Sequence, residues 1–118
     1  MVKIVNNLGS VSISSNVFTV IAGDAATRCF GVKGMVGKAK DSGIYQLLRR
    51  ESMSKGVTVT FNDDDSTVSV ELHIGVDQGV NLIALGSSII NEVAYKVSQA
   101  AGVPVKEVNV FVDAMLIG

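Results

Sequence analysis

The sequence contains no tryptophan, one histidine and one cysteine. A single cysteine cannot form a disulfide within the chain, which suits a reducing compartment. One cysteine and one histidine also cannot supply the four ligands of a structural zinc site. No apolar run approaches the roughly 20 residues that span a bilayer, and the first residues lack the features of a secretory signal. We therefore expect a cytoplasmic protein with no metal, no cofactor and no direct insertion into a membrane.

Motifs of nucleophilic, phosphate-binding and calcium-binding sites are also missing. No Gly-x-Ser-x-Gly elbow and no phosphate-binding loop occur in the chain. A calcium loop starting at Asp63 needs glycine at the position of Val68 and glutamate at that of Ile74. His73 stands beside Glu71 in an alternating run, which is typical of a solvated strand histidine. We therefore predict a protein that is not an enzyme. One alternative stays open, namely an active site shared between two subunits in which His73 and Glu71 act across the interface.

The residues that are present predict one domain over 1–118 with an aliphatic core. Apolar and polar residues alternate as in strands in several segments, at 9–14, 57–61, 68–74 and 108–112, with a shorter candidate at 32–36. Apolar residues at helical spacing follow Ser14 and, further on, run from near Asn81 to Ala101. The resulting β-α-β-β-β-α-β order predicts an α+β fold, a two-layer sandwich with two helices packed on one face of a mixed sheet.

The second helix and the last strand allow finer predictions. Gly86 inside the helix is unfavourable by about 1 kcal/mol relative to alanine, so we expect it to permit close packing. A stripe that begins at Leu82 is expected to face the core, widened by Ile83 and Ile90. In the last strand we expect Val108, Val110 and Val112 to point inward. The outer face of the sheet should then carry Thr58, Thr60, Ser69, Glu71, His73, Asn109 and Phe111.

Basic residues are concentrated in the middle of the chain. Residues 28–55 contain seven basic and two acidic side chains, whereas the remainder contains three basic and nine acidic ones. Asymmetry of this kind can mark a surface for an acidic partner, although a solvated loop region is the simpler explanation. We expect residues 37–55 to form a mobile loop with a short helix built on Ile44, Leu47 and Leu48. The candidate partner-binding residues are Lys33, Lys38, Lys40, Arg49, Arg50, Lys55 and the outward Phe111.

Glycines at 31, 34 and 37 form two overlapping Gly-x-x-Gly patterns next to basic residues. KH domains hold the backbone of a nucleic acid with such a loop between two helices. The alternative function is therefore a small RNA-binding or nucleic-acid-binding module that uses the Gly31–Gly37 loop and the adjacent basic residues. The acidic overall charge does not favour it.

A set of short motifs occurs in order along almost the whole chain. They are Gly9 through Ser14, Val17, Ile21-Ala22, Ala25-Ala26, Gly31-Val32, Lys55 through Val59, Leu72 through Val76, Gly79, Ile90, Val93, Val97, Ala101-Gly102 and Val105 through Val112. In this order and spacing the chain resembles the alkaline shock protein family of envelope stress response proteins from Gram-positive bacteria.

The resemblance implies a non-enzymatic cytoplasmic protein that takes part in cell-envelope homeostasis. Some members of this family self-associate and reach the membrane through an integral-membrane anchor protein. We therefore expect a homo-oligomer that docks to an envelope partner, with any membrane contact made through that partner. The chain departs from many stress-induced members by lacking their charged extensions after the last strand.

The basic segment generates a first prediction. Replacing Arg49 and Arg50 together by glutamate reverses two charges, so the double variant should capture less of an acidic envelope partner. Its circular dichroism spectrum and melting temperature should match those of the wild type. Unchanged capture in affinity purification would remove this segment from the docking surface.

Overall fold

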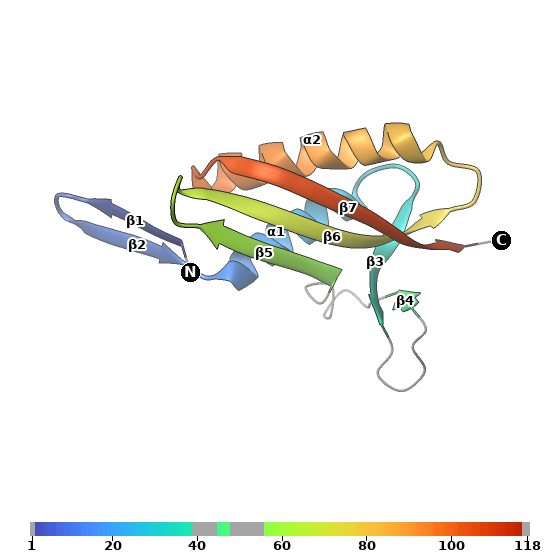
Figure 1. Cartoon of the computed structure of the whole chain (residues 1–118), viewed down its shortest axis with the longest axis horizontal. Helices are drawn as coiled ribbons and strands as arrows, with labels where there is room; N and C mark the ends of the chain where they lie inside the picture. Colours follow the sequence, from blue (N-terminus) through green and yellow to red (C-terminus); the bar gives the residue numbers. More distant parts are fainter. Residues whose placement is uncertain (1, 39–44, 48–55, 117–118) are drawn as a thin grey trace.

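The computed structural model describes residues 2–38, 45–47 and 56–116 (Figure 1). It is an α+β fold in which helices pack on a mixed sheet, as the sequence predicted. In chain order the elements are β1 (Val2–Asn6), β2 (Gly9–Ile13), α1 (Ser15–Thr27), β3 (Val32–Lys38), β4 (Tyr45–Leu47), β5 (Val57–Asn62), β6 (Thr67–Asp77), α2 (Leu82–Ala101) and β7 (Val105–Leu116).

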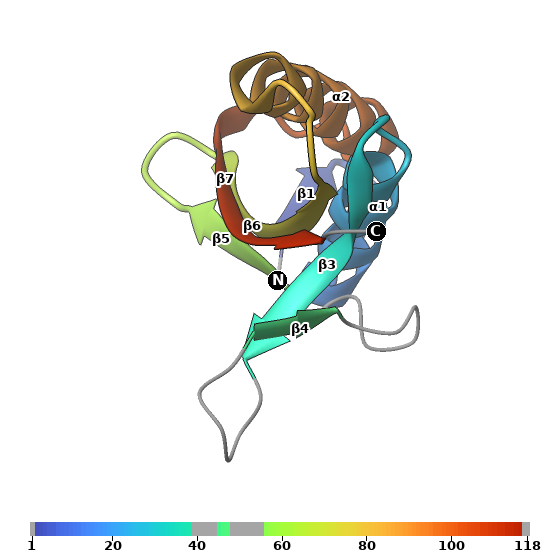
Figure 2. The ribbon, with the colours of Figure 1, turned by 90° about the vertical axis from the view of Figure 1, so that its right-hand side faces the viewer.

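Strand β6 is the centre of the main sheet. β5 pairs antiparallel with its first part, from Val57 opposite Leu72 to Asn62 opposite Thr67, and β3 pairs antiparallel with its last part. β7 lies parallel along the other edge of β6, and α2 makes the connection between these two strands. Figure 2 shows the sheet curling so that its inner surface faces the two helices.

Both helices begin where the sequence predicts, and α2 also ends there. Ser14 caps α1, its hydroxyl accepting from the backbone N–H of Asn16 at 3.3 Å. The side chain of Asn81 caps α2 by accepting from the N–H of Ala84 at 3.0 Å. Gly102 ends α2 at φ +68°, a left-handed conformation that glycine adopts at little cost. Side chains local in sequence therefore fix the helix boundaries.

The core is aliphatic, as expected from the composition. Alternate residues of β6 point toward the helices and are almost fully buried, namely Val68, Val70, Leu72, Ile74 and Val76. The helices meet them with Phe18, Ala22, Ala25 and Ala26 from α1 and Leu85, Ile89, Val93 and Val97 from α2. Because all these side chains are apolar, the hydrophobic effect supplies most of the driving force for this packing.

The predicted apolar stripe of α2 is too wide. Ile83 is 84% exposed, and Leu82 and Ile90 are also exposed. Gly86 makes no close packing contact, because a Cβ added there meets no atom within 4 Å. In β7, Val108 is buried but Val112 is exposed, although Val112 lies opposite the buried Ile74. The last strand lies at the edge of the sheet, where an inward side chain is covered less completely.

Two strands were not predicted. β1 pairs antiparallel with β2, from Val2 opposite Ile13 to Asn6 opposite Gly9, and the hairpin extends away from the body (Figure 1). β4 pairs antiparallel with the end of β3. The helix expected on Ile44, Leu47 and Leu48 is therefore wrong at Leu47, which is in a strand. The rest of that expected loop, 39–44 and 48–55, lies outside the described residues.

The open surroundings of Gly86 generate a second prediction. Gly86→Ala should raise the free energy of unfolding by about 0.5–1 kcal/mol, since alanine loses less backbone entropy in a helix and clashes with nothing here. Chemical denaturation would measure the change. Gly102→Ala is the matched control and should destabilise the fold, because its φ of +68° strains an L-residue. A loss of stability in Gly86→Ala would contradict the prediction.

Candidate functional site

The outer face of the sheet carries the polar residues that the alternation predicted. Across the β5–β6 pair, Thr58 lies opposite Glu71 and Thr60 opposite Ser69. Across the β6–β7 pair, Asn109 lies opposite Glu71 and Phe111 opposite His73. Directly paired residues share a face of a sheet, so all seven predicted residues lie on the face away from the helices. This prediction is confirmed.

His73 is the centre of a cluster on this outer face. Its Nδ1 lies 2.6 Å from Oδ2 of Asp113, and its Nε2 lies 3.1 Å from Oε2 of Glu71. The ring of Phe111 stacks on the imidazole with centroids 4.8 Å apart and planes 12° apart. The histidine side chain is only 30% exposed, so it is held more firmly than the solvated strand histidine that the sequence predicted.

The carboxylate of Asp113 reaches His73 because of a bulge in β7. Val112 lies opposite Ile74 and Ala114 opposite Gly75, which leaves Asp113 as an extra residue without a partner on β6. A bulge of this kind bends the strand and redirects a side chain. Asp113 continues the alternation of Asn109 and Phe111 along the sequence, but its contact with His73, 40 residues away, depends on the register.

The surroundings of His73 set its protonation. Partial burial lowers its pKa, but the hydrogen bonds to Asp113 and Glu71, together with their negative charges, outweigh burial and raise the pKa above its ordinary value. In the described part of the chain, the ring hydrogen-bonds to no hydroxyl or thiol. Both nitrogens are directed at carboxylates, which is an arrangement for a structural ion pair rather than for activating a nucleophile.

The structure describes residues 2–38, 45–47 and 56–116. Within these residues, no group of three or more histidine, cysteine, aspartate or glutamate side chains is placed so that it could hold a metal ion. The aspartates of the β5–β6 turn are exposed, as expected for a hairpin tip. Asp65 accepts a hydrogen bond from Thr67 at 2.6 Å and forms an ion pair with Lys106 at 3.3 Å. These contacts lower the pKa of Asp65, the bond from Thr67 most strongly.

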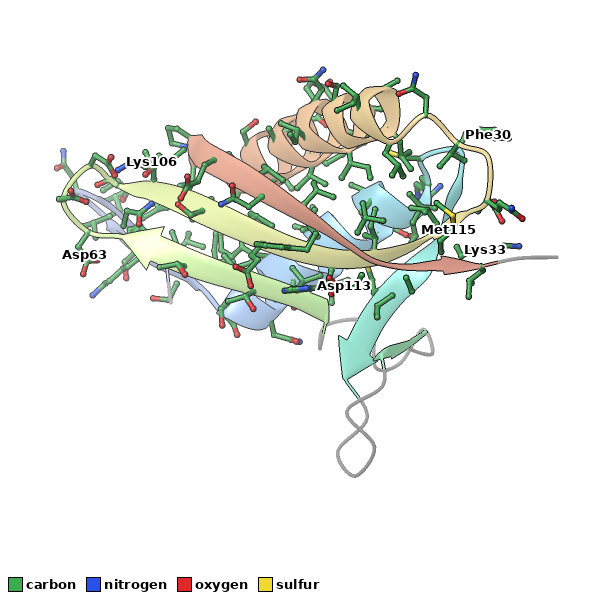
Figure 3. All side chains as sticks on the ribbon, turned by 45° about the vertical axis from the view of Figure 1, so that its right-hand side comes forward. Phe30, Lys33, Asp63, Lys106, Asp113 and Met115 are labelled. Atoms are coloured by element: carbon green, nitrogen blue, oxygen red, sulfur yellow. The ribbon has the colours of Figure 1, made fainter. Side chains whose placement is uncertain are left out.

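A groove of about 990 Å³ opens where the end of α1 meets the start of α2. Phe30 is one of its lining residues and is 96% exposed; its side chain is labelled in Figure 3. Burial, and then the negative charge of Glu92, raise the pKa of the Cys29 thiol in its wall. The groove is lined by Arg28, Cys29, Phe30, Asp77, Gln78, Gly79, Val80, Asn81, Ala84, Leu85, Ser88, Asn91 and Glu92. No local pattern indicates it, because its walls come from segments about 50 residues apart.

The predicted partner-binding residues do not form one described cluster. Lys33 forms an ion pair with Asp77 at 3.3 Å, at the end of β6, whereas Phe111 lies opposite His73, four residues earlier on that strand. The side chain of Lys38 and the whole of Lys40, Arg49, Arg50 and Lys55 lie outside the described part of the structure. Phe111 is 44% exposed, in agreement with its predicted outward position.

The glycine loop expected for nucleic-acid binding is not present. Val32 to Lys38 form strand β3, with Val32 opposite Val76 and Met35 opposite Ile74. KH domains need a loop between two helices to hold a phosphate backbone, and here a strand engages its backbone with the central sheet. The Gly31–Gly37 segment therefore does not have the geometry on which the alternative function depended.

Comparisons with known proteins support the family that the sequence resembles. Residues 3–117 match the model of the alkaline shock protein 23 family, which is described as having a cell envelope-related function. The uncharacterized protein YloU of Bacillus subtilis (strain 168) is 31% identical over 91% of this chain and 88% of its own. The uncharacterized protein Spy1614 of Streptococcus pyogenes serotype M6 is 32% identical, covering 95% and 92% of the two chains. No solved structure matches.

Neither α1 nor α2 is long and apolar enough to cross a membrane.

The His73 cluster generates a third prediction. Because the folded-state pKa is raised, the cluster stabilises the fold fully below the unfolded-state pKa of about 6.5. That stability is lost as the pH rises through the folded-state pKa. His73→Gln should therefore flatten the pH dependence of the unfolding free energy in this window. An unchanged pH profile for this variant would contradict the prediction.

The contribution of Asp113 to the raised pKa of His73 can be measured directly, because His73 is the only histidine in the sequence. Asp113→Asn should move the pKa of His73 downward in an NMR titration of the single imidazole. Asp65→Asn is the control, since Asp65 contacts Thr67 and Lys106 instead, and it should leave the titration unchanged.

Proposed function

The chain belongs to the alkaline shock protein 23 family, whose function is related to the cell envelope, and we propose that it acts there as a non-enzymatic structural protein. In this proposal it self-associates and docks to an envelope partner from the cytoplasmic side of the membrane. The partner, rather than a segment of this chain, makes the contact with the bilayer.

The observation that carries the proposal is the exposed edge of β7 beside Phe111. Among the described residues, β7 pairs with β6 alone, so its backbone groups on the other side have no strand partner. Such an edge is a template for another extended segment. Phe111 supplies an exposed aromatic side chain on the same strand, and aromatic residues are enriched in protein interfaces.

The edge of β7 also has structural features that limit uncontrolled pairing with strands of other molecules. Bulges interrupt its register with β6 near Lys106 and at Asp113, and bulges and charged side chains are common on protected edges. The regular stretch between them, from Glu107 to Val112, is short. A short open stretch favours a specific partner segment over unlimited sheet growth.

The chemistry of the His73 cluster supports a structural role. Its imidazole faces Asp113 and Glu71 and is covered by Phe111, which fixes Phe111 in one orientation. Holding an aromatic side chain rigid on a surface reduces the entropy lost on binding. The basic residues between 28 and 55 would add electrostatic attraction to an acidic partner, and complementary charge mainly speeds and orients such an association.

The fourth prediction tests docking. Phe111→Ala should reduce by about tenfold the amount of membrane protein captured by the tagged protein from detergent-solubilised host cells, as expected for the loss of an aromatic anchor. Asn109→Ala is the matched control on the same face of the same strand and should capture normally. Proteins are identified by mass spectrometry, and circular dichroism checks the fold.

A nuclease arm of the same experiment separates the two functional hypotheses. Capture that resists nuclease and depends on Phe111 supports a protein scaffold. Capture that collapses with nuclease would overturn it in favour of nucleic-acid binding, and equal capture by both variants would remove the edge of β7 from the docking surface.

A further inference from the structure

The β1–β2 hairpin is an arm that projects from one end of the molecule (Figure 1). In the described part of the chain, its two strands pair only with each other. An isolated two-stranded hairpin is at best marginally stable in water. This arm therefore gains stability when something covers it.

One face of the arm is apolar over the two cross-strand pairs nearest its base, whereas the last pair on that face is Asn6 opposite Gly9. At the base, Val2 lies opposite Ile13, and Val2 is buried in the core. The next pair on that face, Ile4 opposite Val11, is 42% and 58% exposed. At the tip, Leu8 is completely exposed. The apolar surface thus continues from the core into solvent, which is typical of an interaction surface.

The groove beside Phe30 lies at the other end of the molecule, far from the arm (Figures 1 and 3). Its apolar wall includes Phe30, Val80 and Leu85, and exposed Ile83 follows on α2. The molecule is 55 Å long, whereas a five-residue strand spans only about 17 Å. The arm therefore cannot reach the groove of its own chain.

The charges of the arm and the groove are complementary. The only charged side chain of the arm is Lys3. In the groove, Arg28 pairs with Asp24 and Asp77 pairs with Lys33, whereas Glu92 has no ion-pair partner among the residues that the structure describes. Lys3 lies opposite Ser12, on the other face of the arm from Ile4 and Val11. The arm therefore carries one positive charge and the groove one carboxylate without an ion-pair partner among the described residues, and opposite charges of this kind favour association.

From these observations we infer that the arm of one copy docks in the groove of a second copy, with Leu8 against the apolar wall beside Phe30. The inference rests on the self-association in the proposed function and names the surfaces that carry it. The two surfaces are different and lie at opposite ends, so the contact is heterologous. Repeating it joins copies head to tail into an open chain, or into a ring if the rotation closes.

The first experiment compares association by analytical ultracentrifugation over a range of concentrations. Leu8→Ser and Phe30→Ser should each weaken association by about tenfold or more, since each removes a large apolar side chain from the interface. Both residues are exposed in the monomer, so neither change should alter the melting temperature. Val20→Ser is the matched control, because Val20 is exposed on α1, away from arm and groove.

The second experiment identifies which surfaces touch. Two variants that lack the native thiol, Asn7→Cys with Cys29→Ser and Ser88→Cys with Cys29→Ser, carry tags of different size and are mixed. Asn7 is an exposed residue next to Leu8, and Ser88 is an exposed residue of the groove. A short bis-maleimide should link the two variants to each other, and should link neither variant to itself. Arms that dock to each other would instead give dimers of the Asn7→Cys variant alone.

The outcomes separate this inference from the proposed function. If the wild type associates but the serine variants associate equally well, or only arm-to-arm dimers form, arm-to-groove docking is overturned while self-association stands. If the wild type stays monomeric at every concentration, the proposal of self-association is wrong. Docking to a partner is then tested by the capture experiment alone. Mixed cross-links together with weakened serine variants support the inference.

Discussion

The parallel pairing of β7 with β6 is the constraint on which the rest of the structure depends. Two neighbouring parallel strands need a long crossover between them, and α2 provides it, so this pairing places α2 over the sheet. The same pairing leaves β7 at the edge. β6 then contributes to both faces of the sheet. One set of its alternate residues fills the core, and the other set, which includes Glu71 and His73, lies on the outer face.

Features decided by neighbouring residues could be predicted from the sequence. The capping side chains of Ser14 and Asn81 and the left-handed Gly102 fix helix ends without help from distant segments. Alternation likewise placed the seven residues of the outer face correctly. For the candidate site, this local information placed His73, Glu71 and Phe111 on one surface, but the pairing of Phe111 with His73 comes from the register of β6 and β7.

Features decided by tertiary packing could not be predicted. The contact of Asp113 with His73 needs the register of two strands and a bulge, neither of which alternation encodes. Gly86 was misread because a helical glycine does not reveal whether a neighbour lies beside it. The groove was missed because Cys29 and Glu92 belong to different helical regions that meet only in the fold.

The unlike ends of this molecule have a consequence for any assembly built through them. Every member of such an assembly points the same way, so the whole has a direction, with a bare arm at one tip and a bare groove at the other. Growth at the two tips then proceeds by different reactions with different rates. A copy whose arm is defective still offers its groove, so it adds at one tip only and, once there, blocks further growth at that tip, while the opposite tip still adds intact copies.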